Sequence, residues 1–229
     1  MANDILSYLE MCAREGLSLQ RGMNFRAGNG CSIILMSQRP NAPYRDRIED
    51  EGATLIYEGH DEPKRADLLD PKSVDQPATT YRNTPTENGK FHQAAQRYLK
   101  GESPPERVRV YEKIREGIWS YNGLFLLVGS WMENDGRRQV FKFKLVADED
   151  DPLGVGQTIE DLESNRLIPS AVKVAVWKRD GGRCVRCGAT DNLHFDHIIP
   201  YSKGGTSLRA ENIQLLCARH NLAKSARIE

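Results

Sequence analysis

The sequence predicts an α+β protein with a larger β-rich N-terminal domain and a small C-terminal domain held together by a metal. Three observations support this prediction. Strand-like apolar runs dominate the first 146 residues, an acidic stretch with Pro and Gly follows, and three of the five cysteines lie in the last 46 residues. A chain of 229 residues is long enough for one medium and one small domain. We therefore expect domains over 1–146 and 170–229, joined by a linker over 147–169.

Short apolar runs between turn residues predict the strands of the N-terminal domain. They cover 31–37, 53–57, 108–114, 124–132 and 140–146. In the last run, apolar residues alternate with Lys142 and Lys144, which predicts one buried face and one basic face. Helical patterns over 1–16 and 88–100 complete the α+β unit, and residues 58–86 predict a long loop rich in Asp, Pro, Thr and Lys.

The C-terminal residues predict the order helix, cysteine turn, strand, loop, strand, helix. Ser170 is a suitable N-cap for a helix that runs to residue 180, where a pair of glycines ends it. The two strands are expected over 193–199 and 213–216, and the last helix over 218–228.

Two pairs of metal-ligating residues frame the C-terminal domain. Cys184 and Cys187 form a C-x-x-C pair, and Cys217 and His220 form a C-x-x-H pair. Two-residue spacers let each pair chelate from a tight turn, and Zn²⁺ takes four nitrogen or sulfur ligands in a tetrahedron. The odd cysteine count argues against a disulfide framework. Because so short a domain has little core, one structural Zn²⁺ is expected to stabilise it.

A second group of residues, between these pairs, suits phosphodiester chemistry. Asp196 supplies a hard oxygen ligand for Mg²⁺ or Mn²⁺, and the adjacent His197 is able to deprotonate water near neutral pH. Successive strand residues face opposite sides, so a local twist or bulge is needed to bring both to one site. Asn221 directly follows His220, so the metal fixes its position. A carboxylate and an amide leave most of a metal's coordination sphere to water and phosphate.

The segment CVRCGATDNLHFDHIIPYSKGGTSLRAENIQLLCARHNLAK resembles the HNH endonuclease family, whose fold is a ββα-metal unit with a zinc knuckle. The resemblance implies that His197 is the general base, and that Asp196 and Asn221 hold one catalytic Mg²⁺ or Mn²⁺. It also implies that Asn212 orients the loop that positions the base. The implied structural zinc ligands are Cys184, Cys187, Cys217 and His220. In some relatives the last His binds the catalytic metal, so that alternative stays open.

The net charge is zero, but it is unevenly distributed. Residues 170–229 carry ten Lys and Arg against five Asp and Glu, a net of +5, and residues 1–169 carry the balancing −5. A basic C-terminal domain suits a partner rich in phosphates. Lys203 and Lys224 are candidate contacts to a DNA backbone. His194 stays open between a phosphate contact, a contact behind the metal ligands and strand packing.

The nuclease motif contains nothing that reads base sequence, so the N-terminal domain should select the site. Tyr44, Asp46 and Tyr57 lie in and after the loop between two predicted strands. A flipped base needs ring faces to stack on and an acceptor for the exocyclic amine of cytosine, and these side chains supply both. On the residues alone, the plainer interpretation is favoured, in which the two tyrosines are edges of a β core.

The order of motifs changes that expectation. The pattern Y-x-D, D-x-G and Y-x-G, then R-V-R-V-Y, Y-N-G-L-F and F-K-F-K-L, resembles the SRA (SET- and RING-associated) domain over about residues 20–146. The resemblance implies a curved, half-barrel sheet with helices that flips 5-methylcytosine into a pocket. It implies that Tyr44 and Tyr57 stack on the base, and that Asp46 reads it, with Asp50 as the alternative because this loop is longer. Ser32 lies in a segment that should line the pocket. Candidate phosphate or groove contacts are Arg21, Arg26, Arg39 and Arg45.

An SRA domain ahead of an HNH nuclease is the layout of bacterial modification-dependent, type IV-like restriction endonucleases. We therefore expect an enzyme that recognises 5-methylcytosine, or 5-hydroxymethylcytosine, in double-stranded DNA and hydrolyses phosphodiester bonds with one metal ion. One HNH site cuts one strand, so double-strand cleavage predicts a homodimer or two copies recruited to the same DNA. The alternatives are an HNH nicking or structure-specific endonuclease without modification dependence, and a non-catalytic reader of methylated DNA.

The sequence also predicts where the protein resides. No apolar run approaches the ~20 residues needed to span a bilayer, and the N-terminus lacks the pattern of a signal peptide. A cytoplasmic location without a membrane partner is expected.

Overall fold

The fold is described from a computed structural model of the chain. The described residues are 4–27, 30–39, 41–50, 53–148, 168–200, 203–224 and 228. Nearly all of the predicted linker lies outside them, so the predicted domain boundaries stay a prediction.

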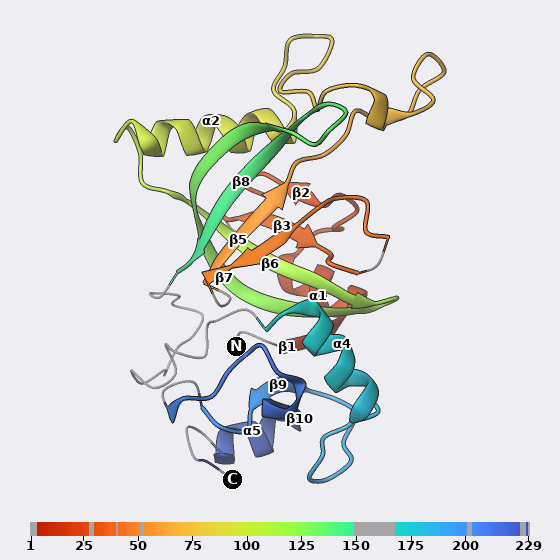
Figure 1. The fold of residues 1–229 in the computed structure, drawn as a ribbon, viewed down its shortest axis with the longest axis vertical. Coiled ribbons are helices and arrows are strands. Elements are labelled where there is room, and N and C mark those ends of the chain that lie inside the picture. Colours follow the sequence, from red (N-terminus) through yellow and green to blue (C-terminus); the bar gives the residue numbers. More distant parts are fainter. Residues whose placement is uncertain are drawn as a thin grey trace.

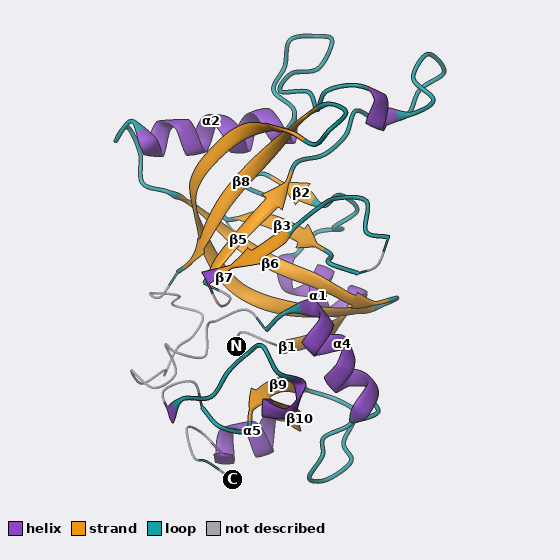
Figure 2. Ribbon diagram, in the orientation of Figure 1, coloured by secondary structure: helices purple, strands orange, loops and turns teal. Residues whose placement is uncertain are grey.

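The N-terminal domain is a strongly curved, mixed sheet (Figures 1 and 2). Its centre is an antiparallel meander of three long strands, to which shorter strands add on both sides. The strands are β2 (Met23–Asn24), β3 (Ser32–Met36), β4 (Arg47–Glu49), β5 (Thr54–Glu58), β6 (Glu106–Arg115), β7 (Ile118–Asn134) and β8 (Gln139–Ala147). The helical segments are α1 (Tyr8–Glu15), η2 (Pro71–Ser73) and α2 (Glu87–Leu99).

The curvature comes from β7, which pairs with β6 along its first half and with β8 along its second. The register slips between Val110 and Tyr111 on one side, and between Leu127 and Gly129 on the other. Such bulges bend a strand and increase its twist, so one strand can serve both halves of the sheet. The helix α2 packs against the sheet through Phe91, within the main apolar core. The predicted α+β architecture with a curved sheet is confirmed.

The predicted helix over 1–16 is wrong at its start. Asp4–Ser7 forms a strand, β1, which pairs with β7, and the helix α1 begins at Tyr8. The physical reason is a capping box. The Ser7 hydroxyl accepts from the Glu10 N–H, and the Glu10 carboxylate accepts from the Ser7 N–H, at 3.2 and 2.7 Å. This pair fixes the helix start and leaves the preceding residues extended.

The predicted basic face of β8 is also wrong at one position. Lys142 is only 2% exposed, and its Nζ lies 2.8 Å from Glu58 Oε2. Glu58 is the directly opposite residue on β5, so the cross-strand neighbour supplies the counter-charge that burial requires. Lys144 remains exposed, as expected.

The C-terminal domain has the predicted order of elements. They are α4 (Ser170–Arg179), β9 (Leu193–His197), η6 (Ala210–Asn212), β10 (Ile213–Cys217) and α5 (Ala218–Lys224). The strands β9 and β10 form an antiparallel pair, and Phe195 packs on Val176 of α4. The N-cap of α4 is Pro169 and not Ser170, because the Ser170 hydroxyl bonds to Glu112 of the N-terminal domain.

The strand β1 connects the two domains into one sheet. Asp4 pairs with Tyr121 of β7 on one side and with His194 of β9 on the other. Figure 1 shows β1 and α4 between the curved sheet and the β9–β10 pair. Among the helices of the described residues, none is long and apolar enough to cross a membrane.

Candidate functional site

The four predicted zinc ligands converge in the structure. The ligand atoms of Cys184, Cys187, Cys217 and His220 all lie within 4.8 Å of one another. His220 Nδ1 is 3.4 Å from the Sγ atoms of Cys184 and Cys217, and the Cys187 and Cys217 Sγ atoms are 3.8 Å apart. Tetrahedral Zn²⁺ with ordinary bond lengths holds its ligand atoms roughly 3.5–3.8 Å apart. Both the donor set and the spacing therefore fit one zinc ion.

The backbone around this cluster favours thiolate. Burial raises the pKa of the Cys184 thiol, but hydrogen bonds from backbone N–H groups of Cys217, Arg186 and Cys187 outweigh it and lower the pKa to about 6. Leu193 and Leu216 pack against the buried cysteines, so the cluster takes the place of a larger core.

Asp196 and His197 end β9 and make different contacts. Asp196 Oδ2 accepts from Gln214 Nε2 at 3.1 Å and lies 3.1 Å from Lys224 Nζ. His197 is buried, and its Nε2 lies 2.9 Å from Ser207 Oγ. Burial and, to a smaller extent, the nearby Lys224 ammonium together lower the pKa of His197 to about 4. The ring is therefore neutral near pH 7, the form in which it accepts a proton.

Lys224 is placed differently from a surface DNA contact. It is 1% exposed, and its Nζ donates to the His197 carbonyl oxygen at 2.6 Å as well as pairing with Asp196. Burial raises the pKa of Asp196, and the Lys224 ammonium and the Gln214 amide oppose that rise. The lysine thus contacts both predicted catalytic residues, through the Asp196 carboxylate and the His197 carbonyl oxygen.

Asn212 closes the loop after β9. Its Oδ1 accepts from the Ile199 N–H at 2.8 Å, and its Nδ2 donates to the carbonyl oxygens of Ile199 and Thr206, each at 3.0 Å. Gly205 passes so close that an added Cβ would lie 1.8 Å from the Ile199 oxygen. One amide and one glycine therefore hold the loop that follows His197.

The other predicted residues of this domain lie on three different segments. Asn221 is in α5, half-buried, on the helix that also carries Lys224. Lys203 is exposed at the loop after β9. His194 is buried, with its Nδ1 2.9 Å from Asp4 Oδ1, which places it at the junction with β1.

The N-terminal domain carries a cavity of about 490 Å³ at one end of β3 and β5. This volume is in the range of small-molecule sites. It is lined by Leu19, Gln20, Arg21, Gly22, Leu35, Ser37, Pro43, Tyr44, Asp46, His60 and Trp119. Three predicted residues, Arg21, Tyr44 and Asp46, are thus brought together from separate segments.

A histidine takes the place expected for a second tyrosine. The rings of Tyr44 and His60 are stacked, with centroids 4.9 Å apart and planes within 10°. Tyr57 lies beneath this pair in the core, and its hydroxyl is 2.9 Å from His60 Nε2. Gly22 allows the approach, because an added Cβ there would lie 2.6 Å from the His60 ring. Burial lowers the pKa of His60 to about 4, so the stacked ring is neutral.

Asp46 is anchored by two backbone groups. Its carboxylate oxygens accept from the Ser37 and Glu58 N–H groups, at 3.2 and 3.1 Å. Burial raises the pKa of Asp46 to about 7 despite these bonds. The alternative, Asp50, lies in the turn between β4 and β5, where it accepts from the Thr54 hydroxyl. Of the two carboxylates, the structure places Asp46 at the cavity.

Ser32 and three of the predicted arginines are not among the residues that line the cavity. The Ser32 hydroxyl donates to Glu106, and Arg26 forms an ion pair with the same carboxylate at 2.9 Å. Arg39 Nε donates to Ser37 Oγ, and Arg45 is exposed next to the loop of Tyr44.

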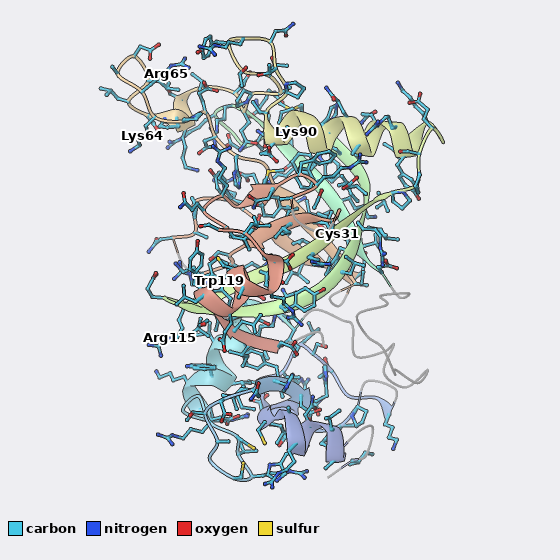
Figure 3. The ribbon with its side chains drawn as sticks, turned by 180° about the vertical axis from the view of Figure 1, so that it is seen from behind. Cys31, Lys64, Arg65, Lys90, Arg115 and Trp119 are labelled. Carbon is cyan, nitrogen blue, oxygen red and sulfur yellow. The ribbon has the colours of Figure 1, made fainter. Side chains whose placement is uncertain are left out.

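A second cavity of about 740 Å³ adjoins the first and shares Arg21 and His60 with it. Its rim includes Lys64, Arg65 and Lys90, which lie at the end of the molecule away from the C-terminal domain (Figure 3). Figure 3 also places Trp119 below them, near the C-terminal domain. The residues that the sequence did not single out for the cavity, His60 and Trp119, carry no short-range motif that marks them.

The comparison with known families matches residues 184–227 to the HNH endonuclease family. This part of the chain is an HNH endonuclease domain. The prediction of a DNA nuclease with this domain at its C-terminus is confirmed. The HNH domain contains all four zinc-ligand candidates and the pair Asp196 and His197.

No curated protein matches the chain. Among solved structures, the SUVH5 SRA domain with hemi-methylated CG DNA is similar, at 24% identity and a TM-score of 0.41, over 63% of this chain and 83% of that chain. KRYPTONITE with mCHG DNA is similar at 18% identity and a TM-score of 0.42, over 66% and 33%. The type IV phosphorothioation-dependent restriction endonuclease ScoMcrA is similar at 15% identity and a TM-score of 0.42, over 99% and 55%.

Proposed function

We propose that this protein is a modification-dependent DNA endonuclease, in which the N-terminal domain binds a flipped, modified cytosine and the HNH domain hydrolyses the DNA. The observation that carries the proposal is the pairing of two sites in one chain. An HNH domain lies beside a domain whose cavity combines a stacked aromatic pair, Tyr44 and His60, with the carboxylate of Asp46.

The cavity supplies what a flipped cytosine needs. Tyr44 offers a ring face for stacking, and Asp46, held by two backbone N–H groups, offers an acceptor for the exocyclic amine. Leu19, Leu35 and Trp119 add apolar surface against which a 5-methyl group can pack. The substrate class is therefore double-stranded DNA with 5-methylcytosine, or with 5-hydroxymethylcytosine.

In the HNH domain, His197 accepts the proton of the attacking water, and its contact with Ser207 Oγ holds the ring. Asn212 keeps the following loop in place, and Lys224 supports the His197 carbonyl. Asp196 and Asn221 supply the oxygen donors that would hold one Mg²⁺ or Mn²⁺. When bound, such an ion stabilises negative charge on the phosphate and on the leaving 3′ oxygen.

A structural Zn²⁺ bound to the four-residue cluster would stabilise the domain. Because Asn221 directly follows the ligand His220, the same ion would fix the position of Asn221. One HNH site breaks one strand, so a double-strand break requires two copies acting together, as in a homodimer.

The test is cleavage of one plasmid prepared unmethylated, CpG-methylated and hydroxymethylated, with Mg²⁺ and with Mn²⁺. Cutting confined to modified DNA supports the proposal. Equal cutting of all three leaves an HNH endonuclease and removes the base-reading role of the N-terminal domain. Two variants separate the activities. His197→Ala should abolish cleavage and keep binding to methylated duplex, and Tyr44→Ala should lose methyl preference. Binding without any cleavage by the unaltered protein would indicate a reader instead.

A further inference from the structure

A continuous run of half-buried and buried polar contacts joins the base cavity to the C-terminal domain. It begins at the cavity, where Gln38 Nε2 donates to the Asp46 carbonyl oxygen at 3.1 Å. The other end of the same amide, Gln38 Oε1, lies 3.0 Å from Ser170 Oγ and shares the single hydroxyl proton of Ser170 with the Glu112 carboxylate. Ser170 is the first residue of α4, so one side chain touches both the cavity loop and the nuclease.

The run continues into a buried ion pair between the domains. Lys173 of α4 is 0% exposed, and its Nζ lies 2.7 Å from Glu112 Oε2 on β6. The same ammonium donates to Asn122 Oδ1 at 2.5 Å and to Ser120 Oγ at 3.2 Å. Ser170 also bonds to the Glu112 carboxylate. The lysine's three donors thus each have a partner, all from the N-terminal domain.

The helix α4 packs in turn against β9, the strand that carries Asp196 and His197. Val172 and Val176 lie on α4 and pack against Phe195, which directly precedes Asp196. Ile5 of the connecting strand β1 packs against the same cluster. Phe195 thus links the docked helix to the pair of residues that performs the chemistry.

A buried ion pair adds little net stability compared with an apolar contact, but breaking it by separating its partners is costly. Removing two charges from water costs several kcal/mol, which is recovered only when geometry is good and the remaining hydrogen bonds are made. Sliding or rotating the HNH domain would leave Glu112 or Lys173 buried without a partner. An apolar contact of similar area would tolerate such a movement.

We propose that Gln38, Glu112 and Lys173 are positioning residues that hold the HNH site at one fixed distance from the modified base. This inference rests on the proposed function. It assigns the choice of cut position to the domain interface. A nuclease joined to the reader only through the covalent chain would cut over a wide range of distances.

The test compares Gln38→Ala with the control Gln96→Ala, because the Gln96 side chain donates one hydrogen bond, to the Ser130 carbonyl oxygen, away from the contacts of α4. A linear duplex with a single methylated site is cut, and the ends are mapped to the nucleotide. The unaltered protein and Gln96→Ala should cut at one narrow position. Gln38→Ala should bind methylated duplex normally but spread its cuts, with cleavage at the main position falling by about tenfold or more.

A second variant guards against misfolding from an unpaired charge. Glu112→Gln with Lys173→Met removes both charges together, so neither is left buried alone. It should spread the cuts as Gln38→Ala does, and should raise amide hydrogen exchange over 170–179. Unchanged cut positions in both variants would overturn the proposal, as would broad cutting by the unaltered protein. If the unaltered protein showed no preference for methylated DNA, the proposed function would be wrong. Amide hydrogen exchange over 170–179 would still show whether Gln38, Glu112 and Lys173 hold α4 in place.

Discussion

The two functional regions of this molecule are assembled in different ways. In the HNH domain, every residue assigned to metal or catalysis falls between residues 184 and 221, on two short strands, a helix and the turns between them. In the N-terminal domain, the cavity draws its lining from residue 19 to residue 119. The first site is built by local chain geometry, and the second by the curvature of a sheet.

This difference decides how each site can fail. The HNH domain has a small core, so its geometry depends on the ligand cluster at Cys184, Cys187, Cys217 and His220. The cavity is set into a domain with its own large apolar core, so single changes there should alter binding and leave the fold intact.

The largest expected effect is loss of the zinc. Cys217→Ala, or treatment with a strong chelator, should unfold the HNH domain, because structural Zn²⁺ contributes an apparent ~10–16 kcal/mol in small zinc-dependent domains. Hydrogen exchange should rise over β9 and β10, while α2 and β6 keep their protection. Zinc content, measured by elemental analysis, should fall from one ion per chain to none.

The matched control is Cys31→Ala, which removes a half-buried cysteine outside the cluster. It should keep the zinc and the exchange pattern. If the chelated protein kept full protection of β9 and β10, the apolar core of the HNH domain would be sufficient to keep it folded without zinc. The proposed difference in stability between the HNH domain and the N-terminal domain would then be wrong.

The sequence signals of the HNH domain are short-range, because the two-residue spacers, the D-H pair and Asn212 lie within one continuous motif. The four candidate zinc ligands come together in the structure, and Asn212 bonds to the loop after β9. Most strands and helices were also predicted within a few residues, since apolar runs and turn residues mark them.

Long-range partners explain what the sequence did not predict. Asp4–Ser7 is a strand because β7 and β9 flank it, and Lys142 is buried because Glu58 lies opposite. His60 reaches Tyr44 only through the fold, and nothing adjacent to it in sequence marks it as an aromatic of the cavity. Gln38 likewise contacts Asp46 and Ser170 only because the fold brings these two distant segments together.

The next prediction concerns this unexpected ring. His60→Ala should weaken binding to methylated duplex by about tenfold, because aromatic stacking on a base is worth ~1–3 kcal/mol and Tyr44 would lose the ring that holds it parallel. Fluorescence anisotropy with methylated and unmethylated duplexes measures the change. His92→Ala is the control, since His92 contacts Ser130 outside the cavity lining. Tighter binding by His60→Ala would show that the imidazole blocks the slot.

The smallest expected effect is a pH dependence that belongs to the N-terminal site. Burial raises the pKa of Asp46 to about 7, so the carboxylate gains a proton as the pH falls below that value. A protonated Asp46 loses acceptor capacity toward the exocyclic amine of cytosine, so the preference for methylated duplex should fall severalfold between pH 8 and pH 6. Asp46→Asn should show a weak preference that does not change over this range.

The same proton has the opposite effect on stability. The folded-state pKa lies above the ordinary Asp value of 3.8, so between about pH 4 and pH 7 the folded protein binds a proton that the unfolded chain lacks. The contribution of Asp46 to the free energy of unfolding therefore falls as the pH rises through this window, while base recognition improves. Thermal unfolding of the unaltered protein and of Asp46→Asn, from pH 5 to pH 8, measures this. If both respond equally to pH, Asp46 is ionised throughout, and the pH dependence of binding must then come from another group.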